Sequence, residues 1–330
     1  MKEKIMKNNK LILIVISLFL ITFSVVGCGT KNNEEDLSQN NTQNATTDET
    51  IVINDARGEV TIPKNPQKIV DISGFSDTLH IIGYNVIGTA NSDAYDYTKF
   101  PVYLEDIFEG TTILGYSMQS TMDIESIISL EPDLIIMSNV QEKMYDQLSN
   151  VAPTVMIEME QTDWAQDLQN VASIFGKEDI AKEWLDTYYE KATKIGNSIK
   201  EKYSEDKTYL SILASGGQIF VFDTAGFGSF LYEDLGLAKP ENMPEQENIS
   251  LPVVSYEGLA QINPDYIFAI ATEEDKVQLE SNAIWQNIDA VKKENYIFLP
   301  SSPYFNQAYS PIGRLLLLDE IEGLMNKFEK

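Results

Sequence analysis

Short apolar runs separated by amphipathic segments occupy most of the chain from Ile51 onward. Ile51–Ile53 and Val60–Ile62 flank the turn-forming segment Asp55–Gly58, which predicts a β-hairpin. Further strands are predicted at Lys68–Ser73, Val86–Ala90, Leu134–Met137, Thr154–Ile157, Tyr209–Leu213, Ile219–Phe222, Tyr266–Ile270 and Tyr296–Leu299. Helices are predicted between many of these strands, and this alternation is typical of a doubly wound, largely parallel sheet. The pattern therefore predicts an α/β fold.

One predicted helix is much longer than the others. The segment from Glu178 to about Tyr203 has apolar and aromatic residues along its length and contains no proline. Because the α/β pattern lies on both sides of this helix, the chain is predicted to form two lobes. The divisions are residues 50–160 for the N-terminal lobe, 161–205 for the bridging helical segment and 206–330 for the C-terminal lobe.

The same phrase occurs once in each lobe, at residues 123–136 and 255–268. Each copy begins with a residue that can cap a helix, continues through a glutamate and an apolar helix, and ends with Pro-Asp and a buried strand. The repeat predicts that the lobes are built alike. The glutamates, Glu125 and Glu257, fall in the first helical turn, where a negative charge stabilises the helix dipole by about 0.3–1 kcal/mol.

The N-terminus has the pattern of an export signal. Lys2, Lys4, Lys7 and Lys10 precede the uncharged segment Leu11–Phe23, and small residues lead to Cys28, the single cysteine. This arrangement is similar to bacterial lipobox sequences, in which the cysteine is acylated and becomes the first residue of the mature chain. Residues 1–27 are therefore predicted to be a lipoprotein signal peptide, and residues 28–49 a lipidated Cys28 with a flexible polar tether. A transmembrane helix is the alternative, but the apolar stretch is near the lower length limit.

Composition limits the partners and the chemistry. The formal net charge of −27 repels nucleic acid, so no nucleic-acid partner is expected. His80 is the only histidine, and its place in a predicted helix favours a packed core residue. Without imidazole or thiolate groups, a metal ion held directly by the protein has no suitable ligand set. Arg57 and Arg314 are the only arginines, which limits bidentate recognition of strongly anionic ligands.

The chain from Ile51 to its end resembles the cobalamin/siderophore-type substrate-binding lipoproteins of ABC importers. The resemblance rests on both repeated phrases and on the segments Ile62–Val70, Tyr145–Thr154 and Ile284–Lys292. It implies two Rossmann-like lobes joined by a single long rigid helix, with the ligand in the cleft between them. It also implies that Glu125 and Glu257 dock onto a permease dimer, which works with a cytoplasmic ATPase. The lipid on Cys28 would hold the protein on the outer face of the cell membrane, as expected in a bacterium with a single membrane.

Ligands of doubly wound lobes meet the loops at the carboxyl ends of the strands. The candidate cleft residues on such loops are Tyr95, Tyr97, Tyr116, Met118, Gln119, Asn139, Phe227, Tyr304, Asn306, Tyr309 and Arg314. These loops are aromatic and polar but poor in positive charge, although ordinary loop packing explains any single tyrosine as well. Such a lining suits a small, weakly charged iron chelate, and a ferric hydroxamate siderophore is favoured over a trianionic catecholate. No cofactor is expected.

Several alternatives remain open from the sequence. Met118 matches the place where some haem-binding relatives supply an iron ligand, but the opposing histidine is absent and only a tyrosinate could replace it. Cobalamin is a further candidate ligand. Arg314 could donate to a ligand oxygen or pair with an acidic surface residue. A secreted hydrolase that uses cleft carboxylates is a more remote alternative, because the chain lacks the metalloprotease, serine-hydrolase and phosphate-loop motifs.

Overall fold

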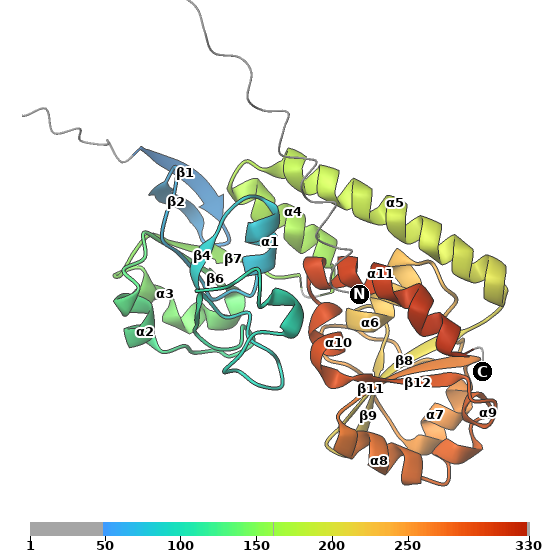
Figure 1. The fold of residues 1–330 in the computed structure, drawn as a ribbon. Coiled ribbons are helices and arrows are strands. Elements are labelled where there is room, and N and C mark those ends of the chain that lie inside the picture. The colour runs from blue at the N-terminus through green and yellow to red at the C-terminus, as the bar shows by residue number, and fades with distance from the viewer. Residues whose placement is uncertain (1–48, 161, 329–330) are drawn as a thin grey trace, which may run out of the picture. The chain divides into compact units, whose positions relative to one another are not determined.

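The computed structural model describes residues 49–160 and 162–328 (Figure 1). The predicted signal peptide, Cys28 and all of the tether except Glu49 lie outside these residues. Within the described part of the chain, no helix has both the length and the apolar character needed to cross a membrane.

The N-terminal lobe contains a five-stranded sheet in the order β5-β4-β3-β6-β7, and all its strand pairs are parallel. The predicted hairpin is present as the antiparallel pair β1 and β2. The strands are β1 (Thr50–Asp55), β2 (Gly58–Pro63), β3 (Ile69–Asp71), β4 (Val86–Thr89), β5 (Thr112–Ile113), β6 (Leu134–Ser138) and β7 (Thr154–Ile157). The helices are α1 (Ser76–Ile81), η2 (Val102–Leu104), α2 (Ile124–Ser129), η3 (Asn139–Met144) and α3 (Tyr145–Leu148).

The C-terminal lobe contains a second five-stranded sheet, in the order β10-β9-β8-β11-β12. Its strands are β8 (Tyr209–Ser215), β9 (Gln218–Phe222), β10 (Val253–Val254), β11 (Tyr266–Ala271) and β12 (Tyr296–Pro300). Its helices are α6 (Gly226–Ser229), η4 (Phe230–Asp234), α7 (Tyr256–Ile262), α8 (Glu273–Ser281), η5 (Trp285–Asn287), α9 (Asp289–Lys292), α10 (Ser301–Gln307), α11 (Pro311–Met325) and η6 (Asn326–Phe328).

One edge of this second sheet is antiparallel. β8 and β9 form a hairpin whose two-residue turn is Gly216-Gly217, with φ of +58° and +77°. Such a turn needs positive φ at both central residues, which glycine adopts without steric cost. The largely parallel sheet predicted from the sequence is therefore correct for β8, β11 and β12, whereas β9 runs antiparallel to both of its neighbours, β8 and β10.

The long helix α5 (Glu178–Tyr203) confirms the predicted helix and packs on both lobes. Ala181 and Leu185 belong to an apolar core of the N-terminal lobe, and Tyr188 and Ala192 belong to a core of the C-terminal lobe. Gly196 lets the helix approach closely, because a Cβ there would lie 1.9 Å from the Leu235 carbonyl oxygen. Helix α4 (Trp164–Ile174), which the sequence pattern did not single out, precedes α5 and packs against it.

Each sheet has an apolar core on both faces. In the N-terminal lobe, one core includes residues of α5 and the other includes Ile127 of α2. In the C-terminal lobe, Leu259 of α7 likewise belongs to the core that does not include α5. Helices α2 and α7, which contain the repeated glutamates, therefore cover the sheet faces opposite to α5 (Figure 1).

The aspartate of each repeated Pro-Asp has a structural task that the sequence did not indicate. The Asp133 carboxylate accepts hydrogen bonds from the backbone N–H groups of Gln67 and Lys68, at 2.7 and 2.9 Å. The Asp265 carboxylate accepts one from the backbone N–H of Thr208 at 3.0 Å. Each aspartate thus secures the entry of the neighbouring parallel strand, β3 or β8. The repeat therefore fixes strand pairing as well as helix placement.

Candidate ligand-binding site

A cavity of about 520 Å³ lies between the two lobes. Its size is within the range of about 300–1,000 Å³ that is usual for small-molecule sites. Aromatic side chains of both lobes and of α4 form much of its wall, namely Phe75, Tyr103, Tyr116, Trp164, Phe220, Phe305 and Tyr309. Ligand contacts in this cavity would be mainly apolar and aromatic.

The fold explains why these segments meet. Gly74 and Phe75 follow β3, Asn91 and Ser92 follow β4, and Ser117 lies in the loop after β5, so all stand beyond the carboxyl ends of parallel strands. The short α10 follows β12 in the same way and brings the opposing lobe to the cavity. This placement follows the rule for doubly wound sheets.

Some of the residues predicted for the cleft line this cavity. They are Tyr116, Met118, Asn306, Tyr309 and Arg314. Two more predicted tyrosines pack on residues of the wall without being part of it. Tyr97 stacks on Tyr116 with ring centroids 5.2 Å apart, and Tyr95 meets the edge of Phe305 at 5.9 Å.

Like Tyr95 and Tyr97, the other four predicted cleft residues do not line the cavity. Gln119 accepts a hydrogen bond from the Tyr116 backbone N–H at 2.9 Å, Asn139 is exposed at the start of η3, and Tyr304 donates to Glu320 at 3.0 Å. Phe227 has to be reassigned to the core, because it is fully buried and its ring packs between those of Phe230 and Phe268.

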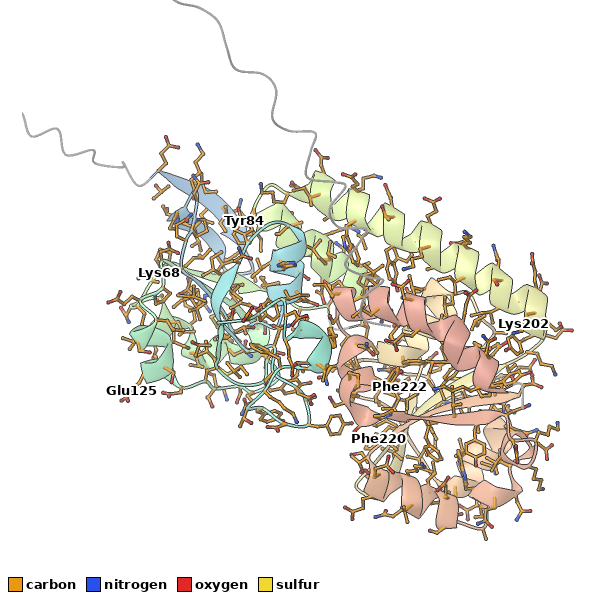
Figure 2. The ribbon with its side chains drawn as sticks, in the orientation of Figure 1. Lys68, Tyr84, Glu125, Lys202, Phe220 and Phe222 are labelled. Carbon is orange, nitrogen blue, oxygen red and sulfur yellow. The ribbon has the colours of Figure 1, made fainter. Side chains whose placement is uncertain are left out.

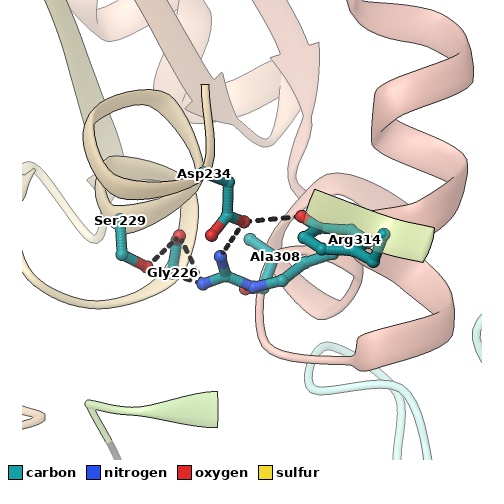
Figure 3. A network of polar contacts seen from close by, with 6 residues as sticks. Gly226, Ser229, Asp234, Ala308 and Arg314 are labelled. Atoms are coloured by element: carbon teal, nitrogen blue, oxygen red, sulfur yellow. Dashed lines mark hydrogen bonds and ion pairs between the residues drawn. The ribbon is translucent and has the colours of Figure 1, made fainter. Parts of the chain in front are cut away.

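Arg314 lies at the cavity but is fully engaged in a buried network (Figure 3). Its guanidinium donates to Asp234 at 2.6 Å, to the hydroxyl of Ser229 at 2.6 Å and to the carbonyl of Gly226 at 3.1 Å. Its Nε donates to the Ala308 carbonyl at 2.9 Å. The sequence left ligand binding and ion pairing open for this arginine. The structure pairs it with a buried carboxylate rather than a surface one.

The tyrosines of the wall are neutral phenols. Burial, with a smaller contribution from neighbouring tyrosines and Asp93, raises the pKa of Tyr116 to about 12. Burial likewise raises the pKa of Tyr309. These hydroxyl groups therefore remain protonated near neutral pH and can donate hydrogen bonds to a ligand oxygen.

Hydrogen bonds between described residues join the lobes beside the cavity. The pairs are Asp77–Ser310, Asp93–Ser302 and Ala94–Asn306, and in the last the backbone N–H donates to the amide oxygen at 3.0 Å. Asp77 and Asp93 are both buried. Burial raises the pKa of Asp77 to about 6, although the Ser310 hydroxyl and the Thr78 backbone N–H favour its ionised form.

A metal site of protein ligands alone is not present in the described residues, where no group of three or more His, Cys, Asp or Glu side chains could hold an ion. His80 does not belong to the core, because its side chain is exposed on α1 and the expectation of a packed histidine is wrong.

The family model described as "Periplasmic binding protein" matches residues 88–303, which include most of both lobes and α5. The chain belongs to this family. It is a family of substrate-binding transport proteins rather than of enzymes.

Three relatives illustrate the similarity of this periplasmic binding protein to others. It is 29% identical over 310 residues to "Iron(3+)-hydroxamate-binding protein FhuD" of Bacillus subtilis, covering 91% of this chain and 94% of the relative. It is 26% identical over 294 residues to "Probable siderophore-binding lipoprotein YfiY" of the same organism, covering 84% of this chain and 88% of the relative. A crystal structure of an FhuD fold-family component of a Fep/Fec-like ferrichrome ABC transporter of Bacillus subtilis superposes with a TM-score of 0.68 and 29% identity, covering 82% and 98%. The predicted fold of two α/β lobes and a long helix is thereby confirmed.

The repeated glutamates of this periplasmic binding protein are both exposed. Asp123 caps α2 by accepting from the Glu125 backbone N–H at 3.0 Å, and Ser255 caps α7 by accepting from the Gly258 N–H at 3.1 Å. Figure 2 shows Glu125 on the outer surface of its lobe. Neither glutamate forms an ion pair with another described residue, so both carboxylates can meet a basic partner.

The sequence missed several residues of the wall. Trp164 and Phe220 line the cavity but were not among the candidates, and neither were Asp77 and Asp167. Trp164 and Asp167 are on α4, in the segment between the lobes. They were missed because only loops at the carboxyl ends of strands were considered. Trp164 itself, the only tryptophan of α4, was the available signal.

Proposed function

We propose that the protein binds a ferric hydroxamate siderophore in the cavity between its lobes and delivers it to an ABC permease. The observation that carries this proposal is the cavity itself, with its aromatic wall, its neutral phenols and its one arginine already paired with Asp234. A hydroxamate chelate presents carbonyl oxygens and methylene arms, which match hydrogen-bond donors and aromatic surfaces. A trianionic catecholate would need cations that the described wall does not offer.

The names of relatives support the same ligand class. FhuD of Bacillus subtilis is an iron(3+)-hydroxamate-binding protein, and the solved structure belongs to a ferrichrome transporter. No resident cofactor is needed for this function, because the iron arrives inside its chelate. An enzymatic role, such as hydrolysis by cleft carboxylates, has no supporting observation.

Delivery would use the exposed glutamates of α2 and α7. Glu125 and Glu257 would contact basic residues of the permease dimer, whose cytoplasmic ATPase drives import. A lipid on Cys28 and the polar tether would keep the binding unit on the outer face of the membrane, near the permease, and raise its effective concentration there. The description of YfiY as a lipoprotein supports this location.

Tryptophan fluorescence tests ligand binding. Trp164 lines the cavity, whereas Trp285 is buried in the C-terminal lobe on the sheet face away from α5. Full-length protein in detergent is titrated with a panel of ferric hydroxamates, ferric catecholates, ferric citrate and haem. We expect saturable quenching with hydroxamates, most of it lost in Trp164→Phe and retained in the control Trp285→Phe. If no member of the panel gives saturable quenching, the iron-chelate function is refuted. If haem alone gives saturable quenching, haem replaces the ferric hydroxamate as the proposed ligand.

A further inference from the structure

The cavity wall contains a negative charge, on Asp77, that no neighbouring cation among the described residues balances. Asp77 of α1 lines the cavity with 2% of its surface exposed. Its oxygens accept hydrogen bonds from neutral donors, the Ser310 hydroxyl and the Thr78 backbone N–H, the latter at 2.9 Å. Neutral donors stabilise a carboxylate without cancelling its charge. Its charged neighbour, Asp71, is a second carboxylate.

The only positive charge on the described wall is already paired with a carboxylate. Arg314 is the only Lys or Arg among the described residues that line the cavity, and its ion pair with Asp234 is buried. Asp167 adds another carboxylate to the lining. A charge placed in such an enclosed, partly apolar site acts over a longer distance than it would in water.

An unpartnered polar atom lies on the same lobe. Ser92 lines the cavity with 3% exposure, and its hydroxyl has no hydrogen-bond partner among the described residues. A buried hydroxyl in this state is unfavourable, and it can accept a hydrogen bond from a ligand N–H or donate one to a ligand oxygen. The charge on Asp77 therefore favours a cationic donor on the ligand, whereas the Ser92 hydroxyl adds a polar contact for either a donor or an acceptor.

We propose that the cavity favours a ferric chelate with an ammonium group over the same chelate without that charge, and that Asp77 makes the distinction. This inference rests on the proposed function, because it takes the cavity as the chelate site. Two opposite unit charges about 12 Å apart, at an effective dielectric constant of about 20, change an affinity about tenfold. The preference is set by the ligand's charge and is independent of its iron centre.

The test compares two chelates that differ only in charge. Full-length protein in detergent at pH 7.5 and low salt is titrated with the ferric complex of a linear trihydroxamate ending in a primary amine, and with its N-acetylated form. Asp77 is mostly ionised at this pH, because its pKa is about 6. We expect the amine form to bind about tenfold more tightly in the wild type. In Asp77→Asn the ratio should fall toward one, because asparagine can still accept from Ser310 but has no charge.

A matched control removes a carboxylate elsewhere. Asp186 is exposed on α5 and pairs with Lys182, so Asp186→Asn should keep the tenfold ratio. Equal affinities for both chelates in the wild type would overturn this inference and leave the proposed function standing. A ratio unchanged in Asp77→Asn would also overturn it. Failure of both chelates to bind the wild type would refute the proposed function instead.

Discussion

At the scale of single residues, the strongest constraint near the cavity is the buried pair of Arg314 and Asp234. The Arg314 Nη1 and Asp234 Oδ2 atoms are 2.6 Å apart, and both side chains are almost entirely excluded from water. Tyr188 of α5 donates to the same carboxylate at 2.5 Å, so the pair also ties the long helix to the C-terminal lobe. The guanidinium lies over the ring of Trp164, 5.1 Å from its centroid. The network therefore holds the tryptophan of the wall in place.

Removing one partner of this pair should be costly. Arg314→Met leaves Asp234 buried without its cation, and we expect the free energy of unfolding to fall by about 3–5 kcal/mol. The double variant Arg314→Met with Asp234→Asn should recover part of this loss. Urea unfolding followed by circular dichroism measures both. As a control, Lys191→Met removes an exposed pair with Asp319 and should cost less than about 1 kcal/mol. An Arg314→Met variant as stable as this control would contradict the argument.

At the scale of elements, the two repeated helix–strand units give the lobes matching surfaces. Helices α2 and α7 each begin at a capped residue, expose a glutamate in the first turn and bury their apolar side against the sheet face opposite to α5. The aspartates that follow fix the neighbouring strands. Because these tasks fall to different residues of each repeat, the glutamates are free for an external partner.

The docking role of the glutamates predicts a separation of binding from transport. Glu125→Ala combined with Glu257→Ala should leave the chelate affinity within about twofold, because neither residue lines the cavity, and should abolish uptake. Fluorescence titration and uptake of radioactive ferric hydroxamate by cells measure the two effects. The control pair Glu183→Ala and Glu190→Ala on α5 removes the same charge from another surface and should transport normally. Normal uptake by the first double variant would refute docking through these residues.

At the scale of the whole binding unit, two buried carboxylates are hydrogen-bonded across the two lobes. Asp77 and Asp93 on one lobe accept hydrogen bonds from serines of the other, and both are sealed from water. Opening would return Asp77 to water, where its pKa falls back toward its usual value near 4. The closed form therefore binds a proton on Asp77 more tightly than the open form does.

This difference predicts that acid favours closure. As the pH falls from about 6 to about 4, protonation of Asp77 should stabilise the closed form by up to about 3 kcal/mol, and the effect is lost above pH 6. Energy transfer between dyes on Lys143→Cys and Ser281→Cys, in a Cys28→Ser background, measures closure. The Tyr103 hydroxyl and Asp71, which lie near Asp77, also have raised pKa values. Both residues belong to the same lobe as Asp77, so opening of the lobes would not separate them from it. In Asp77→Asn the acid-induced change should be much smaller, and an unchanged profile would contradict the prediction.

The sequence by itself determined the local pattern of this protein. Apolar periodicity located the long helix, the hairpin and most strands, and the repeated phrase predicted two lobes of similar build. These features depend on which face of a segment is buried. The spacing of apolar residues along that segment indicates the buried face directly. The loops that meet at the cavity could also be named, because the carboxyl ends of parallel strands lie on one edge of a sheet.

Only the tertiary structure decided which buried groups meet. Asp234 and Arg314 are 80 residues apart, and no periodicity connects them. Phe227 follows a strand as a cleft residue would, yet its ring fills the core, whereas Trp164 from outside both lobes reaches the cavity. The periodicity of a segment indicates that a side chain is buried, but it does not indicate which other residues that side chain contacts. These contacts depend on packing between segments that are distant in sequence. The same packing determines which charged side chains lie on the cavity wall.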